Sequence, residues 1–463
     1  MADIGKVLYT AQQALLSNLT AINVTGSNIA NVNTPGYSRL RPLFEAVGSN
    51  DPQSGREQIG VRISNVERIF DKFLESQMIS QQSSLSKFTA QEDILSRIEA
   101  ILNENAGGGI NDAIADFLNA WGNLSVDPLS KSKRDMVIST GENLSRLFNL
   151  RVQSLVDIQL NADDGIADEI SRLNGYLQDV ARYNELIVSA ENAGSTAHAV
   201  RDQRGLVLNE ISKIIDINYV EKSDGSIYIY MPDGGKTLVE GFNSWQLQVQ
   251  VNTANHNFYD VVFENNPTQV LNDRIKGGSL GGYLEMRDNI IPSYIGMLDA
   301  TALALMDRVN TLHASGYDQD GIQGEMFFIY DAANAAATMS VNIAVSTDTR
   351  KIAASESSHA DGNKATAITT LKTEINIVLG TTIDGYFNSF IAKIGRDAVD
   401  AKQAVIRETT IYNQQVEQRE QLSGVSLDEE MMNLIKYQMA YGAAGRMTAT
   451  VNELIDTLLN LVR

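Results

Sequence analysis

The sequence predicts a mainly α-helical protein with an inserted β domain, in which the two ends of the chain form long helices that pair like a coiled coil. Apolar residues recur at helical intervals at both ends, the period changes to two from about residue 216, and the helical period then returns. Because a β-rich unit interrupts the helical pattern, we expect the helical body to be built from both halves of the chain.

The N-terminal helix is predicted over residues 1–35. Its narrow apolar stripe includes Leu8, Leu15 and Ile22. Near its end, the stretch NVTGSNIANVNTPGYSR carries four asparagines, Asn28 and Asn31 among them, before and beside a Pro-Gly break. Asparagine disfavours a helix interior because its amide competes for backbone hydrogen bonds. Helix formation alone therefore does not explain this stretch.

The C-terminal helix is predicted over residues 427–463, with Ser426 as its N-cap before an acidic first turn. Its apolar residues follow coiled-coil spacing and are Met432, Ile435, Met439, Val451, Leu454, Leu458 and Leu461. Each terminal stripe is too narrow to belong to a globular core, so we expect the two stripes to meet.

Six segments are predicted between these helices. They are an extended linker at 36–67, a first helical part at 68–215, a β-rich outer insert at 216–282, a second helical part at 283–316, a small irregular insert at 317–385 and a third helical part at 386–426. Alternation in SIYIYM, which Asp-Gly turn sequences flank, indicates strands in the β-rich insert.

Composition excludes several functions. The net charge of −20 opposes non-specific binding to nucleic acid, because phosphate repels an acidic surface. The absence of cysteine excludes disulfides, thiolate metal sites and cysteine nucleophiles. We expect no membrane insertion, since no apolar run reads as long enough to span a bilayer. The N-terminus lacks the features of a secretory signal, which indicates a cytoplasmic protein or one exported without a cleaved signal peptide.

No motif predicts catalysis, a metal or a cofactor. KGGSLGG at 276–282 lacks the spacing of a phosphate loop and reads as a turn. GYDQDG resembles a calcium loop, but Gly316 and Phe327 would occupy its first and twelfth positions, where acidic ligands are needed. The four histidines lie in different segments, and acid pairs such as Glu429–Glu430 read as solvated faces and caps. Trp121 reads as a core residue, and the chain is predicted not to be an enzyme.

ALLSNLTAINVTGSNIANVNTPGYSR resembles the N-terminal signature of the bacterial flagellar axial proteins, which include the rod, hook and hook-associated families. The stretches RDQRGLVLNEISKIIDINYVEKSDGSIYIYMPDGGKTLVEG and REQLSGVSLDEEMMNLIKYQMAYGAAGRMTATVNELIDTLLNLVR are similar to the hook-associated protein 1 family within that group. The resemblance runs in order from about residue 4 to the end of the chain. Relative to that family the central region is short, and 317–385 is too small for a full second outer domain.

The resemblance implies a structural junction protein at the tip of the flagellar hook, outside the cell, that connects hook to filament. Its terminal helices would pack into an inner tube domain around the export channel. It implies several partners, namely other copies in a ring, the hook protein, the next hook-associated protein on the filament side, and an export chaperone at the C-terminal helix. Export would use the flagellar type III apparatus, without a cleaved signal. Another axial protein, of the hook or distal rod, is the alternative, and a wall-degrading enzyme is a third hypothesis.

Within this frame two hypotheses stand for Asn28 and Asn31: they form lateral contacts in the tube, or they terminate the helix. The strip with Met432, Ile435 and Met439 suits a chaperone groove, the tube, or each in turn. Because an isolated helix pair is marginal in water, we expect both termini to be largely disordered in the free monomer and helical after assembly.

Overall fold

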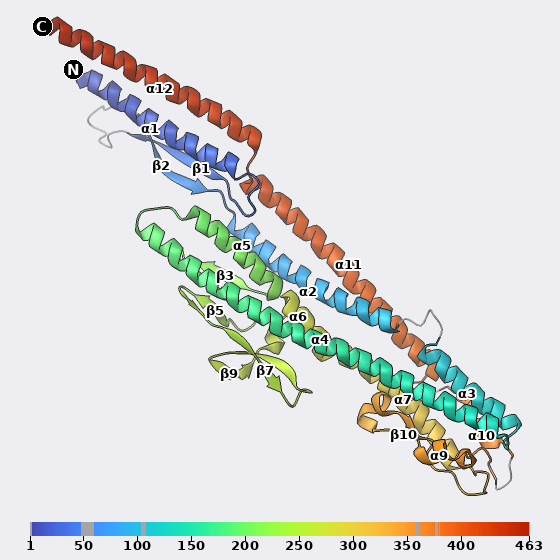
Figure 1. Ribbon diagram of the computed structural model, residues 1–463. Coiled ribbons are helices and arrows are strands. Elements are labelled where there is room, and N and C mark those ends of the chain that lie inside the picture. The colour runs from blue at the N-terminus through green and yellow to red at the C-terminus, as the bar shows by residue number, and fades with distance from the viewer. Residues whose placement is uncertain are drawn as a thin grey trace.

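The computed structural model describes residues 2–47, 60–102, 108–357, 361–375, 378 and 380–462. Its helices form a long, narrow molecule, and both ends of the chain lie together at one end of it (Figure 1). The inserted β strands lie beside the middle of the helical body rather than at a tip (Figure 1). The predicted class, mainly α with an inserted β domain and paired terminal helices, is confirmed.

The long helices carry the architecture and the short ones connect them. The helices are α1 Ala2–Ala30, α2 Lys72–Leu102, α3 Ile110–Val126, α4 Lys131–Asn192, α5 His198–Ile214, α6 Gly278–Glu285, α7 Ile291–Ala314, α8 Ala335–Thr338, α9 Ile343–Thr347, α10 Asn363–Thr370, α11 Ile383–Ser423 and α12 Leu427–Val462.

The strands form small antiparallel sheets. One hairpin consists of β1 Leu40–Val47 and β2 Gly60–Arg68. A four-stranded sheet consists of β3 Asn218–Glu221, β4 Ile227–Tyr230, β5 Thr237–Glu240 and β6 Asn243–Ser244, and a three-stranded sheet of β7 Leu247–Asn252, β8 Phe258–Phe263 and β9 Asn266–Val270. The two-residue strands β10 Phe328–Ile329 and β11 Ser340–Val341 pair with each other.

The terminal helices α1 and α12 pack against each other, with the N- and C-termini at the same outer end (Figure 1). The β1–β2 hairpin covers another side of α1, where the Ser17 hydroxyl donates to the Val61 carbonyl of β2 at 2.9 Å. A hairpin therefore occupies much of the segment predicted as an extended linker at 36–67. With 36 residues against 29, α12 is longer than α1.

In the middle of the body, α2 packs along α11, and α4 runs beside both α5 and the β insert. Two asparagines of α4, half-buried Asn174 and buried Asn184, hold the sheets in place. Asn174 donates to the Leu247 carbonyl and accepts from its N–H, and Asn184 donates to the carbonyls of Ile227 and Gly241. These bonds satisfy strand groups that have no strand partner, so the insert is fixed to the helical body.

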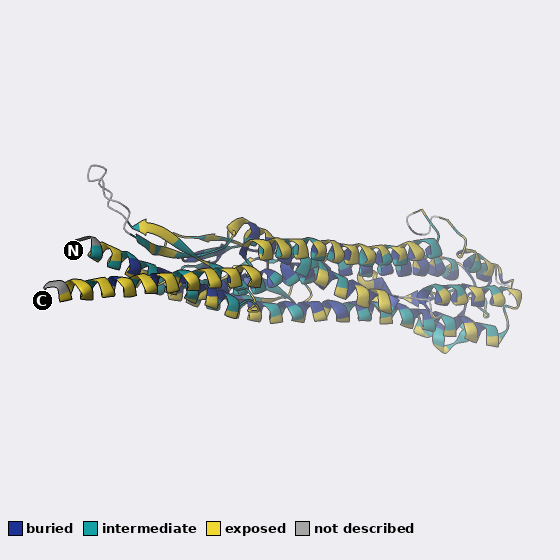
Figure 2. Ribbon diagram, turned by 90° about the horizontal axis from the view of Figure 1, so that it is seen from above, coloured by how far each residue is buried: buried dark blue, intermediate teal, exposed yellow. Residues whose placement is uncertain are grey.

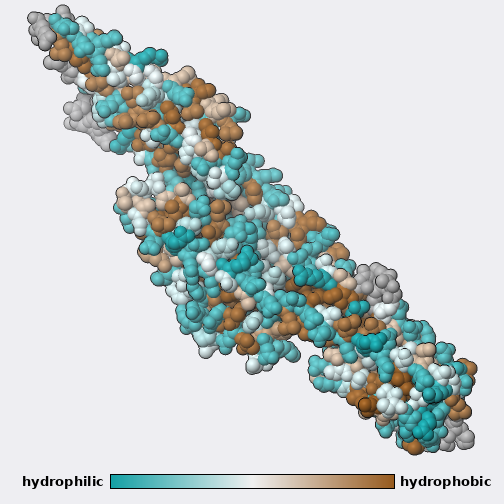
Figure 3. All heavy atoms as spheres, viewed as in Figure 1, coloured by the Kyte–Doolittle hydropathy of each residue, from teal (hydrophilic) through white to brown (hydrophobic). Residues whose placement is uncertain are grey.

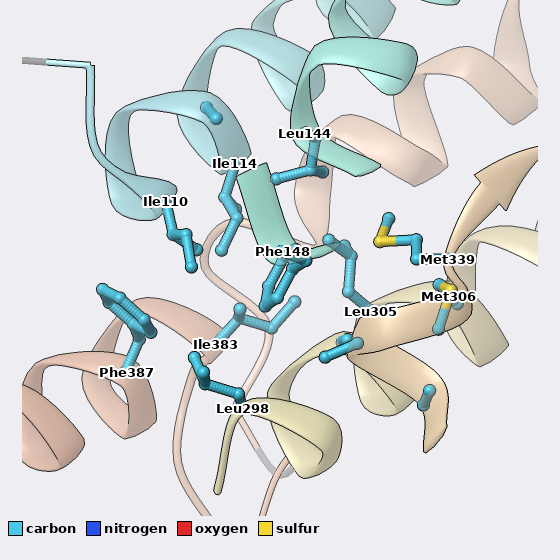
Figure 4. Packing of buried hydrophobic residues seen from close by; sticks show 14 of the residues in the cluster. Ile110, Ile114, Leu144, Phe148, Leu298, Leu305, Met306, Met339, Ile383 and Phe387 are labelled. Carbon is cyan, nitrogen blue, oxygen red and sulfur yellow. The ribbon is translucent and has the colours of Figure 1, made fainter. Parts of the chain in front are cut away.

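The far end of the molecule holds a large apolar core. Figure 4 shows Ile114, Phe148, Leu298 and Phe387 pointing into one space from α3, α4, α7 and α11. Trp121 is fully buried in this core, as its sequence context predicts.

Residues 317–385 require a correction, because they do not stand apart as an insert. Phe327 and Phe328 are fully buried in the distal core, and Phe327 packs against Trp121 with ring centroids 5.5 Å apart. The segment has only short helices and two-residue strands, so it shows no period that would reveal which residues face inward.

A second correction concerns the run Gly278–Ala314. Helix α6, a π-helical turn at Met286–Ile290 and α7 join without a break, which merges the segments separated at residue 283. By length and composition this run could cross a membrane, contrary to the sequence-based expectation that no such run exists. In the most apolar stretch of this run, 39% of the residues are buried inside the molecule. A helix in the core of a protein can have the same length and apolar composition as a membrane-spanning helix.

Two buried polar side chains tie the 317–354 region to the bundle. Arg134 of α4 donates to the carbonyls of Pro128 at 2.7 Å and Ile352 at 2.8 Å. His313, at the end of α7, accepts from the Ala353 N–H at 2.9 Å, and its other ring nitrogen lies 2.5 Å from the Glu325 carbonyl. This pair of bonds requires a neutral imidazole, and burial lowers the pKa of His313 to about 4.

The pKa of His313 makes the distal core acid-sensitive. Because the unfolded chain binds this proton near pH 6.5 and the folded chain only near pH 4, the stabilisation is complete above pH 6.5 and is lost as the pH falls towards 4. The loss attributable to this residue is about 3 kcal/mol. We expect chemical denaturation at pH 7 and pH 4.5 to show a larger loss of stability in the wild type than in His313→Gln. Equal losses in the two proteins would contradict this.

Candidate functional site

The face of α12 that points away from α1 is apolar and uncovered. Met432, Ile435 and Met439 are 64%, 55% and 64% exposed. Figure 2 shows α12 as an almost continuously exposed ribbon, and Figure 3 shows hydrophobic residues recurring along this end of the molecule. We call the surface formed by Met432, Ile435 and Met439 the outer strip.

The opposite face of α12 packs on α1 and contains Ala444 and Val451, both buried. The seven residues predicted as one seam thus divide between two faces. Met439 and Val451 are twelve residues apart, which turns a helix through three full turns and about a third of another. Val451 therefore faces α1. Leu458, seven residues further on, lies on the same side of the helix but is exposed, and Leu454 lies between the two faces and is also exposed. The side chain of Leu461 lies outside the described residues.

On α1, the predicted residues Leu8, Leu15 and Ile22 are half-buried, and Leu16 and Leu19 are exposed. α1 contacts both α12 and the β1–β2 hairpin, which accounts for the partial burial of its stripe. The terminal pair consequently presents apolar side chains of both helices to its surroundings. In water such a surface favours association, because covering apolar area is the main driving force of protein contacts.

Asn28 ties together three segments that are remote in sequence. Its side-chain amide donates to the Leu40 carbonyl at 2.9 Å and to Glu430 Oε2 at 3.0 Å. Its oxygen accepts from the Tyr37 hydroxyl at 2.9 Å and from the Leu40 N–H at 3.0 Å. The residue is 1% exposed. These bonds use both donors and both acceptors of the amide within the single chain. A contact of Asn28 with a neighbouring subunit stays a prediction.

Asn31 has a local role in the structure. Its amide donates to the Ser27 carbonyl at 2.9 Å, and its oxygen accepts from the Thr34 hydroxyl at 3.2 Å. Both bonds close the C-terminal turn of α1 before the Pro35-Gly36 break. This geometry matches the helix-terminating alternative, and a contact of Asn31 with a neighbouring subunit stays a prediction.

Glu430 is the functional residue that sequence reasoning missed. Although it was read as a solvated cap, it is 2% exposed and accepts from Arg39 Nε at 2.8 Å, while exposed Glu429 accepts from Arg39 Nη1 at 2.7 Å. Neighbouring positions on a helix point about 100° apart, so the two acids can lie on different faces, but the pair itself does not show whether either faces inward. We call Asn28, Tyr37, Arg39, Leu40 and Glu430 the joint. Burial raises the pKa of the Tyr37 hydroxyl.

Further contacts anchor the joint to the helical body. The Arg39 N–H donates to the Ser423 carbonyl at the end of α11, at 2.9 Å. Asp202 of α5 accepts from the Ser38 N–H at 3.2 Å and from Arg68 Nε at 2.7 Å. The terminal pair is thus connected to the body through polar bonds rather than through an apolar core.

A cleft of about 460 Å³ lies beside the joint, between α2, α5, β3 and the end of α11. Its charged side chains form ion pairs with one another. Glu221 pairs with three basic residues, Lys72, Arg201 and Arg204. Arg201 also pairs with Glu191, Arg68 pairs with Asp202, and Arg419 pairs with Glu75. Burial lowers the pKa of Arg204 to about 10, which keeps it charged at neutral pH. The ion pairs around the cleft therefore connect neighbouring elements of the body.

Of the two loops weighed as ligand sites, the one at Asp318 is a turn, and the one at 276–282 leads into α6. Asp318 accepts from the N–H groups of Asp320 and Ile322 and pairs with Lys351 at 3.1 Å, so its carboxylate is already occupied. Gly278 has φ +70°, and a Cβ there would lie 2.2 Å from the Ile214 carbonyl oxygen, so glycine serves close chain approach. Within the described ranges no group of three or more His, Cys, Asp or Glu side chains could hold a metal ion.

Three family models match the chain. The flagellar hook-associated protein FlgK helical domain matches residues 95–328, the flagella basal body rod protein model matches 8–37, and the flagellar basal body rod FlgEFG protein C-terminal model matches 418–461. The first covers half of the chain.

Known proteins match over nearly the whole length. Flagellar hook-associated protein 1 of Bacillus subtilis is 29% identical, with 98% of this chain and 97% of the relative covered. The same-named protein of Salmonella typhimurium is 24% identical, with 99% and 100% covered. The solved structure of the flagellar hook junction protein FlgK from Burkholderia pseudomallei shares the fold, with a TM-score of 0.68, 15% identity, and 75% of this chain and 100% of that one covered.

Removing the amide at the joint should release residues 37–40 from α1 and α12. Asn28→Ala leaves the half-buried Leu40 N–H, the Leu40 carbonyl and the Tyr37 hydroxyl without their partner. We expect a cost of about 3 kcal/mol, hence roughly hundredfold faster trypsin cleavage after Arg39, whereas Pro42 protects the bond after Arg41. Asn23→Ala, at an exposed position of the same helix, is the matched control. Cleavage of both variants at the same rate would refute this role of Asn28.

Proposed function

This chain belongs to the family of flagellar hook-associated proteins defined by the FlgK helical domain, and on that premise we propose that it is the structural subunit that joins the flagellar hook to the filament. It lies outside the cell, at the end of the hook. Its role is mechanical: it binds neighbours on several sides and transmits torque between two different helical assemblies.

The observation that carries the proposal is the outer strip. An exposed apolar surface of this length on a monomer marks a place where another protein binds. It lies on the terminal pair, at one end of a narrow molecule, and α1 packs against the opposite face of α12 (Figure 1). That placement suits a subunit whose ends line a tube while its body projects outward.

Other copies of the chain are the first partners of this surface. In a closed ring each subunit presents one face and receives a different face of its neighbour, so two unlike apolar surfaces are needed. The terminal pair offers them: the outer strip on α12, and Leu16 and Leu19 on α1, which are also exposed. The hook protein below and the next hook-associated protein above would contact the ends of the ring.

An export chaperone is a partner at an earlier stage. The first half of α12 is rich in methionine, whose apolar side chain is flexible and suits a hydrophobic groove that binds a helix. The same side chains would serve the chaperone before export and the ring after it. Export without a cleaved signal is part of this proposal, as membership of the family implies.

We propose no catalytic role, because the charged side chains of the cleft are paired with each other. The remaining alternative is another axial protein, such as a hook or distal rod protein. It has support in the two rod-protein models that match residues 8–37 and 418–461. The helical-domain match at 95–328 favours the junction protein.

Charges on the outer strip should prevent assembly without unfolding the chain. We expect Ile435→Glu combined with Met439→Glu to weaken binding of the purified chain to isolated hooks by at least about a hundredfold, since two apolar contacts are lost and two charges are buried. In cells, the variant should leave hooks without filaments; missing hooks would instead favour the hook or rod alternative. Leu150→Glu, at an equally exposed apolar position on α4, is the matched control.

Electron microscopy of the cells and sedimentation with hooks give the two readouts. If the double variant binds hooks as tightly as Leu150→Glu does, the outer strip is not the assembly surface and the proposal loses its main support.

A further inference from the structure

Methionine is unevenly distributed over the molecule. Five methionines of the body are buried, namely Met78, Met231, Met286, Met306 and Met339. Four others lie in α12 between residues 431 and 447, and all of them are exposed. Since the chain has no cysteine, methionine provides its only sulfur. The accessible thioethers are thus concentrated on the terminal helix.

Two of these thioethers share the outer strip. Met432 and Met439 are seven residues apart and so lie on one side of α12, with Ile435 between them. Each is 64% exposed, and no described segment of the chain covers that side. An oxidant in solution therefore reaches them directly, whereas it reaches Met286 and Met306, which are fully buried, only after unfolding.

We propose that Met432 and Met439 form an oxidation-sensitive modification site, and that their conversion to sulfoxides by a peroxide prevents a subunit from joining the hook. The inference rests on the proposed function, because it assumes that the outer strip is the assembly surface. It adds a chemical control of assembly: free subunits are vulnerable to an oxidant, and subunits already in place are protected by their neighbours.

The chemistry is a two-electron oxidation. A lone pair of the methionine sulfur attacks one oxygen of hydrogen peroxide, an S–O bond forms, and the O–O bond breaks. The departing hydroxide takes up the proton of the attacked oxygen and leaves as water. Sulfur is oxidised by two electrons and the peroxide is reduced, so no further reactant is needed.

Methionine sulfoxide, the product, does not suit the apolar surface on which it forms. A sulfoxide oxygen is a strong hydrogen-bond acceptor, and burying it against apolar side chains leaves it without a donor. Both modified positions belong to the outer strip. We therefore expect the doubly oxidised subunit to bind hooks at least about tenfold more weakly than the reduced one.

The test uses the purified full-length chain, hydrogen peroxide and isolated hooks. Peptide mass mapping should show that Met432 and Met439 gain one oxygen each before Met286 and Met306 do. Hook binding should fall in parallel and return after treatment with methionine sulfoxide reductases. The variant Met432→Leu with Met439→Leu is compared with its own untreated sample, and peroxide should not change its binding to hooks.

A matched control separates this site from general oxidation. Met136 and Met326 are also exposed but lie on the body, so Met136→Leu with Met326→Leu should remain sensitive to peroxide. The proposal is overturned if oxidised wild type binds hooks normally, if the Met432/Met439 variant loses binding like wild type, or if reductase restores nothing. If untreated wild type does not bind hooks, the proposed function itself fails, which is a distinguishable result.

Discussion

The buried amide of Asn28 is the interaction on which the arrangement of this molecule depends. It holds the end of α1, the chain at Tyr37 and Leu40, and the first turn of α12 together through bonds that use its full hydrogen-bonding capacity. A buried polar group that is fully satisfied specifies one geometry, because any shift leaves donors or acceptors unpaired. The pairing of the two ends of the chain is therefore set at the joint.

The two ends of the molecule are stabilised by different interactions, apolar packing at the distal end and hydrogen bonds at the terminal end. The distal end closes an apolar core around Phe148 and Leu298, and residues 317–354 complete that core. The terminal end has no comparable core, so α12 is aligned by polar bonds and leaves its outer strip in water. A subunit built in this way keeps its body intact alone and reserves one apolar surface for neighbours. That division suits a protein that must be monomeric before it reaches its place.

Periodicity in the sequence was enough to predict the long helices, the β insert and the pairing of the termini. Periodicity could not say which side of α12 would face α1, because a repeat of apolar residues identifies a stripe but not its partner. Met439 and Val451 were predicted to lie on one seam, but in the structure they lie on different faces of α12. Periodicity also missed Glu430, whose burial depends on Arg39 nearly four hundred residues away. Residues 317–385 were misjudged because their elements are too short to show a period. The family resemblance gave the function, which no spacing of residues could.

The central claim is that the terminal pair is an incomplete surface that other subunits complete. Hydrogen exchange of the backbone amides, measured on the free chain and on the chain assembled onto hooks, tests it most directly. The account predicts protection at the joint but fast exchange along the outer parts of α1 and α12 in the free chain, strong protection of both helices on assembly, and unchanged exchange in α3, α4 and α7. Termini that are already protected in the free chain, with no gain on assembly, would contradict it.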